Sequence, residues 1–257
     1  MTRTVLVAVT VGFAVTQVAN FATTIYLHRT LAHRALTLHP SMAVGFRVLI
    51  WVTTGIRPRQ WAAVHRKHHA FTDRPEDPHS PARLGWVRVQ LTNVMLYRRV
   101  ARDREQVVRY AGRDLPPDRL DRLLFDHALL GLGLGWAVLI LLCGWPIGVS
   151  AGLFHVVLYL GLSGSVNAVA HTFGPRPYDN SATNVRWLAW MTAGEGLHNN
   201  HHAAPTSARF ALAPGEIDLG WYPIRFLEAL GLAGVRHRQP HFVSSRHPAD
   251  RRHSDHG

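Results

Sequence analysis

The chain has 257 residues, of which 47% are hydrophobic and only 17% are charged. This composition excludes a disordered chain, collagen and a disulfide-rich fold, and the shortage of charge points to a membrane protein. A single cysteine, Cys143, excludes an internal disulfide and any cysteine-ligated zinc or iron–sulfur site within one chain. The net charge of +12 is compatible with three kinds of binding partner, namely nucleic acid, anionic lipid or an acidic carrier of the substrate. The long apolar segments argue against nucleic acid.

The first apolar segment, residues 4–27, contains no charged side chain. At ~1.5 Å of rise per residue it reaches ~36 Å, enough to cross a hydrocarbon core of ~30 Å. A secretory signal peptide would have a shorter apolar region and a small-residue cleavage site. The sequence therefore predicts a retained transmembrane helix.

Residues 128–149 and 151–171 are two further apolar segments. Gly144, Pro146 and Gly148 lie near their junction, which predicts a tight hairpin with both outer ends on the same side of the bilayer.

Two other segments predict helices at the membrane surface. Residues 42–56 are apolar but too short for a span, and they include Arg47. Residues 86–110 mix apolar side chains with many arginines, as an interfacial amphipathic helix does, although a solvated helix on a soluble face has a similar composition.

The expected fold is an all-α integral membrane protein. It has about three transmembrane helices, interfacial helices and a cytoplasmic helical cap, because the positive-inside rule places the basic regions 57–126 and 171–257 in the cytoplasm. Residues 1–236 are expected to form one domain. Residues 237–257 are expected to be a basic, histidine-rich, disordered tail.

Histidine is unusually frequent, at 18 residues, and most of the histidines are clustered. Two clusters are H-x-x-H-H motifs, namely His65, His68, His69 and His198, His201, His202. A further pair, His28 and His33, follows the first span. His171 lies at the end of the third span, four residues after Asn167. Positions i, i+3 and i+4 of a helix share one face, so each H-x-x-H-H motif directs three imidazoles the same way.

These clusters all lie at the predicted boundary between membrane and cytoplasm, where they can converge. Their nitrogens are too many for one zinc ion and suit two metal ions with open positions. Nitrogen ligands favour iron, copper or zinc over magnesium or calcium. Isolated histidines such as His39, His127 and His155 are expected to be packed or solvated residues.

The ordered motifs resemble those of the membrane-bound fatty acid desaturases of the acyl-CoA and acyl-lipid Δ9 type. The resemblance runs from about residue 20 to residue 235 and rests on H-R-T-L-A-H (28–33), H-R-K-H-H (65–69), T-D-R-P-E-D-P-H-S-P (72–81), N-A-V-A-H (167–171) and G-E-G-L-H-N-N-H-H (194–202).

The resemblance implies a di-iron enzyme that uses O2 to place a cis double bond in a long acyl chain. The implied metal ligands are His28, His33, His65, His68, His69, His171, His198, His201, His202 and, through a water, Asn167. Asp73, Asp77 and Glu195 are candidates to orient the imidazoles, and Trp61 and Arg74 are candidates to bind the substrate headgroup.

The electrons are expected from a separate donor such as a ferredoxin or a flavoprotein reductase, because the sequence shows neither a cysteine cluster nor a dinucleotide-binding motif. Acyl-CoA desaturases often carry Arg-Asp where this chain has Ala63-Val64, which makes an acyl-lipid or a carrier-protein thioester more plausible than acyl-CoA. Only one span precedes the first motif, so either the start site lies too far downstream or the subgroup is short.

Two alternatives remain open. A hydroxylase on the same scaffold would share the oxidant, and a histidine-rich metal transporter would share the ligands. Transporters place ligands near the bilayer midplane, often with acidic residues in the spans, whereas here the clusters flank spans without Asp or Glu. The expected location is the cell membrane, with the active site on the cytoplasmic side.

Overall fold

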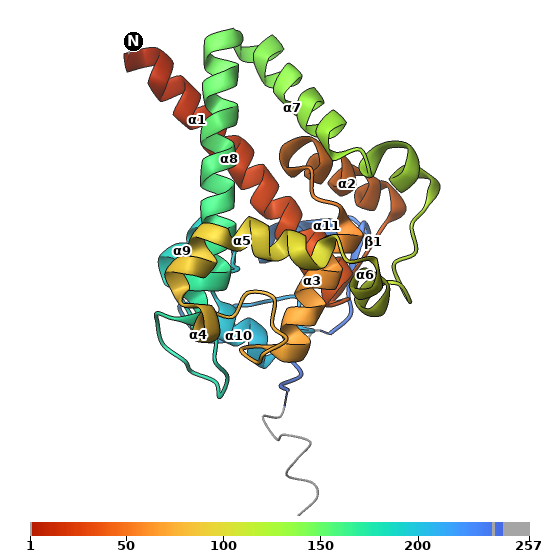
Figure 1. The fold of residues 1–257 in the computed structure, drawn as a ribbon, viewed down its shortest axis with the longest axis vertical. Helices are drawn as coiled ribbons and strands as arrows, with labels where there is room; N and C mark the ends of the chain where they lie inside the picture. The colour runs from red at the N-terminus through yellow and green to blue at the C-terminus, as the bar shows by residue number, and fades with distance from the viewer. Residues whose placement is uncertain (1, 238–239, 244–257) are drawn as a thin grey trace, which may run out of the picture.

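The computed structural model describes residues 2–237 and 240–243 (Figure 1). Long helices rise from a lower half of shorter helices, and regular structure is helical apart from one two-stranded sheet in this part of the chain. The expected all-α architecture is therefore confirmed.

The N-terminal helix α1 (Thr2–Ala22) continues without a break into the π-helix η1 (Thr23–Ala32). Together they form a stretch, Thr2–Ala32, that is long and apolar enough to cross a membrane. This stretch contains the predicted span 4–27 and extends beyond it, so the first two clustered histidines belong to the same helical rod or follow it directly.

Helices α7 (Ala128–Cys143) and α8 (Trp145–Ala168) form the predicted hairpin, seen at the top of Figure 1. The turn is at Gly144, whose φ of 79° lies in the left-handed region that glycine tolerates. The predicted boundary at residue 149 is therefore too late. Residues 145–149 belong to α8, because Pro146 is tolerated in the first turn of a helix.

Helix α8 continues through the short 3₁₀-helix η3 (Val169–His171) and is long enough to span a bilayer. Helix α7 has 16 residues, which corresponds to ~24 Å. The described residues thus hold two helices of spanning length and one shorter apolar helix where three spans were expected.

Helix α2 (Pro40–Thr54) forms over the predicted segment 42–56 and packs closely against α7. A Cβ atom on Gly131 would lie 2.5 Å from the Trp51 ring, and one on Gly135 would lie 2.1 Å from the Val52 carbonyl oxygen. Glycine at these positions therefore allows the two helices to approach.

The predicted helix 86–110 is divided into α5 (Trp86–Ala101) and α6 (Arg104–Ala111). The break is at Asp103, whose carboxylate accepts hydrogen bonds from the backbone N–H groups of Glu105 and Gln106 and so caps α6. Leu91 and Met95 are exposed on α5, in keeping with an apolar outer face.

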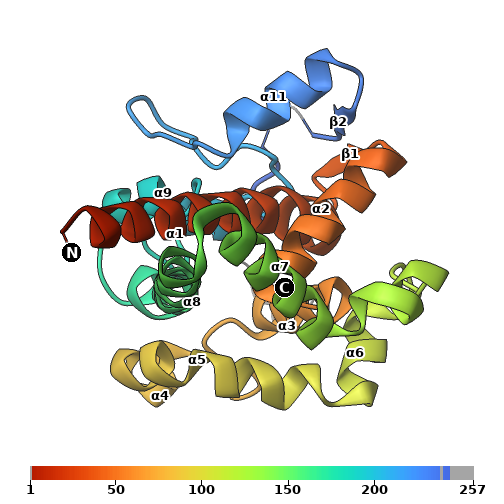
Figure 2. The ribbon, with the colours of Figure 1, turned by 90° about the horizontal axis from the view of Figure 1, so that it is seen from above.

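The remaining elements are α3 (Pro58–Phe71), α4 (Pro81–Leu84), η2 (Asp121–Phe125), α9 (Arg186–Met191), α10 (His198–Ala203), α11 (Trp221–Ala229), β1 (Leu36–Leu38) and β2 (Ala233–Val235). Strands β1 and β2 pair antiparallel. Seen from above, α1 runs between α11 and β2 on one side and α5 on the other (Figure 2).

Residues 238–239 and 244–257 of the predicted tail lie outside the described residues. Just before them, the backbone N–H of Val243 donates a hydrogen bond of 2.8 Å to the carbonyl oxygen of Ala203 at the end of α10. The proposed domain boundary at residue 237 stays a prediction.

The centre of the fold contains a buried ion pair. Arg29, in η1, has a fully buried side chain whose guanidinium donates hydrogen bonds to both carboxylate oxygens of Asp218, at 2.8 and 3.0 Å. It also donates to the carbonyl oxygen of Ala208 and lies 3.8 Å above the Phe210 ring. The C-terminal loops are thereby fastened to the helix that carries His28.

Candidate metal centre

The first pair of histidines comes together because η1 is a π-helix. In a π-helix the backbone hydrogen bonds join residues five apart, so these residues lie nearly one above the other. The N–H of His33 accordingly donates to the carbonyl oxygen of His28. In an α-helix, five residues correspond to about 1.4 turns and would separate the two rings. Here the ring centroids are 4.9 Å apart.

Each H-x-x-H-H motif contributes to two groups of imidazoles. In α3, His65 and His69 turn one way and His68 the other, and in α10 the pair His198 and His202 is separated from His201 in the same manner. The five-histidine group consists of His28, His33, His65, His69 and His201, and the four-histidine group consists of His68, His171, His198 and His202. In each group the candidate ligand atoms lie within 4.8 Å of one another.

The Nε2 atoms point at each other. In the five-histidine group His201 Nε2 lies 3.0 Å from His28 Nε2 and 2.9 Å from His69 Nε2. In the four-histidine group His202 Nε2 lies 3.2 Å from His198 Nε2 and 3.4 Å from His68 Nε2. His171 Nε2 is buried without a hydrogen-bond partner among the described residues.

The three predicted acidic residues lie on the outer side of these rings. His28 Nδ1 lies 2.7 Å from Glu195 Oε1, His68 Nδ1 lies 3.0 Å from Asp77 Oδ1, and His171 Nδ1 lies 3.5 Å from Asp73 Oδ2. A carboxylate accepts a proton-bearing Nδ1, so the Nε2 of the same ring carries a bare lone pair. The Nε2 atoms of His28 and His68 therefore offer lone pairs toward the neighbouring rings, and this all-nitrogen donor set fits a pair of metal ions.

Burial favours the neutral form of six imidazoles of the two groups, and the neutral form is the one that binds metal. Outside the apolar spans, desolvation and then repulsion from neighbouring imidazoles hold six histidine pKa values well below 6.5, namely those of His33, His65, His69, His198, His201 and His202. Burial alone would raise the pKa of Glu195 and of Asp77, but their histidine partners lower it below the ordinary value, so both stay ionised.

His79 was not identified as a site residue from the sequence. It is buried, its ring stacks on His68 at 4.6 Å, and neither ring nitrogen has a partner within the described ranges. With His68 and Asp77 it forms a third group of possible ligands. Its position in the D-P-H segment after the second motif is the only sequence signal that pointed to it.

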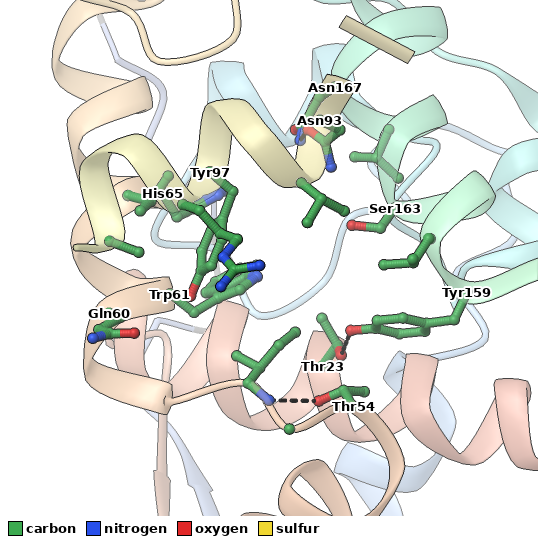
Figure 3. Close-up of a pocket in the computed structure, with 18 of the residues that line it drawn as sticks. Thr23, Thr54, Gln60, Trp61, His65, Asn93, Tyr97, Tyr159, Ser163 and Asn167 are labelled. Carbon is green, nitrogen blue, oxygen red and sulfur yellow. Dashed lines mark hydrogen bonds between the residues drawn. The ribbon is translucent and has the colours of Figure 1, made fainter. Parts of the chain in front are cut away.

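A cavity of about 640 Å³ adjoins the metal-ligand groups (Figure 3). At one end it reaches His65, His198 and Glu195, and elsewhere it is lined by α1, α5, α7 and α8. Half-buried Arg57 and exposed Arg98 and Arg102 also line it, so the cavity has a basic edge at the protein surface.

The other candidate residues are placed as follows. Trp61 lines the cavity and stacks on His65, with ring centroids 4.9 Å apart. Asn167 also lines it and donates a hydrogen bond of 2.9 Å to Asn93 Oδ1. Arg74 is exposed in the turn after α3 and is not among the residues that line the cavity.

Comparison with known proteins shows the family of this chain. The fatty acid desaturase family model matches residues 4–215. The chain is 34% identical to an acyl-CoA C20 Delta5-desaturase of Anemone leveillei, over 83% of this chain and 68% of that protein. It is 32% identical to Delta-9 acyl-lipid desaturase 1 of Arabidopsis thaliana, over 88% of this chain and 74% of that protein. The chain therefore belongs to the fatty acid desaturase family, whose members are iron-dependent oxidoreductases acting on fatty acyl chains.

Proposed function

We propose that this protein is an O2-dependent desaturase that introduces a cis double bond into a long acyl chain, using a histidine-ligated di-iron centre. The observation that carries the proposal is the pair of histidine groups with inward-facing Nε2 atoms beside a cavity of about 640 Å³. With iron bound, the centre would supply the oxidising chemistry by which O2, two external electrons and two protons remove two hydrogens from adjacent methylenes and yield two waters.

The five-histidine group would hold one iron and the four-histidine group the other, with Asn167 acting on the second through a water. Asp73 lies 3.5 Å from Nδ1 of His171, and Glu195 and Asp77 hold the protons on Nδ1 of His28 and His68. They thereby keep each Nε2 available as a ligand and fix the ring orientation.

The cavity would hold the acyl chain against the centre. Val94, Leu132 and Leu160 supply apolar wall, and Trp61 closes the space next to His65. Excluding water from this space protects the oxidising centre from side reactions.

The basic edge would bind the polar end of the substrate. Arg98 and Arg102 are exposed on the α5 side of the cavity, and Arg57 lies at the start of α3. Guanidinium groups bind phosphate oxygens bidentately, so a phosphate-bearing carrier such as a phospholipid or a carrier-protein thioester fits this edge. The same arginines favour a site on the cytoplasmic side of the cell membrane.

Expression in a host that lacks its own desaturase tests the proposal. Monounsaturated chains are expected in the host lipids, and none should form with the His201→Ala variant, which serves as the matched control. Hydroxylated chains would instead select a hydroxylase. Unchanged lipids together with increased metal uptake would select a transporter.

The purified protein should contain close to two irons per chain. A single zinc ion per chain would contradict the proposal. The electron donor is expected to be a separate protein such as a ferredoxin or a flavoprotein reductase, so turnover by the purified protein should require its addition.

A further inference from the structure

Helix α10 needs support from elsewhere in the fold. It has six residues, His198–Ala203, yet it carries three of the histidines in the two groups. A helix this short is unstable alone, because nucleation is costly and few hydrogen bonds repay it. Its sequence, H-N-N-H-H-A, offers no large aliphatic side chain as an anchor. Its capping position is held by Leu197, whose side chain cannot accept a hydrogen bond.

Asn184 provides the missing cap from a different segment. Its Oδ1 accepts hydrogen bonds from the backbone N–H groups of Asn199, at 3.0 Å, and of Asn200, at 3.3 Å. These are first-turn N–H groups of α10, which have no partner inside the helix. Asn184 is 6% exposed and is held next to α10 by an isolated β-bridge to Leu197.

The amide nitrogen of Asn184 also hydrogen-bonds to a side chain of α10. Its Nδ2 donates to Asn200 Oδ1 at 2.7 Å, and the Nδ2 of Asn200 in turn donates to the carbonyl oxygen of Phe210 and to Glu216 Oε2. Asn200 is 1% exposed, so leaving any of these groups without a partner would be costly. The N–H of Asn199 also donates to the carbonyl oxygen of Thr183, at 3.2 Å, and the Asn199 side chain bonds to the segment 178–182. The N–H of Asn200 and its side-chain Oδ1, by contrast, both depend on the Asn184 amide.

We propose that Asn184 is a positioning residue for the metal centre, acting through α10 as its cap. The inference rests on the iron site proposed above. It predicts an unequal effect on the two groups. His198 and His202 are two of the four histidines in one group, whereas His201 is one of five in the other. Movement of α10 should therefore release iron from the four-histidine group first.

The test compares Asn184→Ala, which removes the cap, with Asn184→Asp, which keeps an acceptor oxygen for the two N–H groups. Asp179→Asn, an exposed position five residues earlier, is the matched control. The measurements are the iron content per chain, the 57Fe Mössbauer spectrum and the rate at which a ferrous chelator removes iron. Circular dichroism checks that the helical content is unchanged.

Asn184→Ala should retain about one iron per chain and bind the other about 10–100-fold more weakly, while Asn184→Asp and Asp179→Asn keep close to two. Should Asn184→Ala fail to fold, Asn184→Asp still tests the inference, because loss of its Nδ2 donor should accelerate release of half of the iron only. Retention of both irons by Asn184→Ala at the wild-type release rate would overturn the inference, as would uniform release of both irons from Asn184→Asp. Absence of an iron pair in the wild-type protein would instead overturn the proposed function.

Discussion

Glu195 and His28 are separated by 167 residues in the chain, and the Nδ1 of His28 donates a hydrogen bond of 2.7 Å to Glu195 Oε1. Thr24 donates a second hydrogen bond to the same carboxylate. The acid therefore holds the ring on its outer side and directs Nε2 toward His201, 3.0 Å away.

Replacing Glu195 should weaken iron binding without removing a ligand. Gln at position 195 keeps a hydrogen-bond acceptor but loses the charge. The iron affinity of Glu195→Gln should therefore fall less than that of Glu195→Ala, for which a decrease of about 10–100-fold is expected. Anaerobic titration with ferrous iron measures the affinity. Glu76→Gln, at an exposed position, should bind iron as the wild type does. Unchanged affinity in Glu195→Ala would show that the carboxylate does not tune the site.

Filling the cavity should block turnover while sparing the metal. Ser163 projects from α8 into the space near Tyr159 (Figure 3). The Ser163→Leu variant adds apolar volume there and should displace the acyl chain, and displacements of ~1 Å cost on the order of 10²-fold in rate. Product formation and iron content are measured on the same preparation. The smaller Ser163→Ala variant is the control, and normal turnover of long chains by Ser163→Leu would place the chain elsewhere.

The buried ion pair between Arg29 and Asp218 should be the most sensitive point of the fold. Asp218→Asn leaves the guanidinium, which is fully buried, without its counter-charge, and a loss of about 3–5 kcal/mol in the free energy of unfolding is expected. Chemical denaturation in detergent measures this. The pair of exposed Arg225 and half-buried Glu228 is the comparison, since Arg225→Gln should change stability by less than about 1 kcal/mol.

The metal-free protein should lose stability below pH 6.5. Burial lowers the pKa of several histidines well below 6.5, so the unfolded chain takes up protons there that the folded chain excludes. Stability therefore falls as the pH falls through 6.5, by about 1.4 kcal/mol per pH unit for each histidine that stays neutral, and is level above that pH.

Denaturation midpoints between pH 8 and 5.5 measure this dependence. His202→Gln should reduce the slope, because it removes one histidine whose pKa desolvation lowers well below 6.5. A midpoint that stayed constant from pH 8 to 5.5 would contradict the prediction.

The clustering of the histidines was predictable because helix periodicity relates sequence spacing to direction. The prediction that the motif at 65–69 directs three rings one way was wrong, because His65 and His69 enter one group and His68 the other. Which group a ring joins depends on the helices that surround it, and local spacing carries no such information. The membership of the two groups could therefore not be predicted from the sequence.

Other features depend on contacts between distant segments. The π-helix η1 was not foreseen, because π-helices are rare and no residue pattern marks their i→i+5 bonding. The cap that Asn184 provides for α10 joins separate loops, and the cavity is enclosed by helices from most of the chain. The shortness of α7 follows from the turn at Gly144, where several neighbouring glycines and a proline made the position of the turn ambiguous.

Both imidazole groups include side chains from α10 as well as from segments far upstream of it. During synthesis on the ribosome, the five-histidine group cannot be completed before His201 has emerged, nor the four-histidine group before His202, and by then the N-terminal rod formed by α1 and η1 has long been made. A metal ion can consequently meet either complete set of histidines only late in synthesis, after the N-terminal helices have been made.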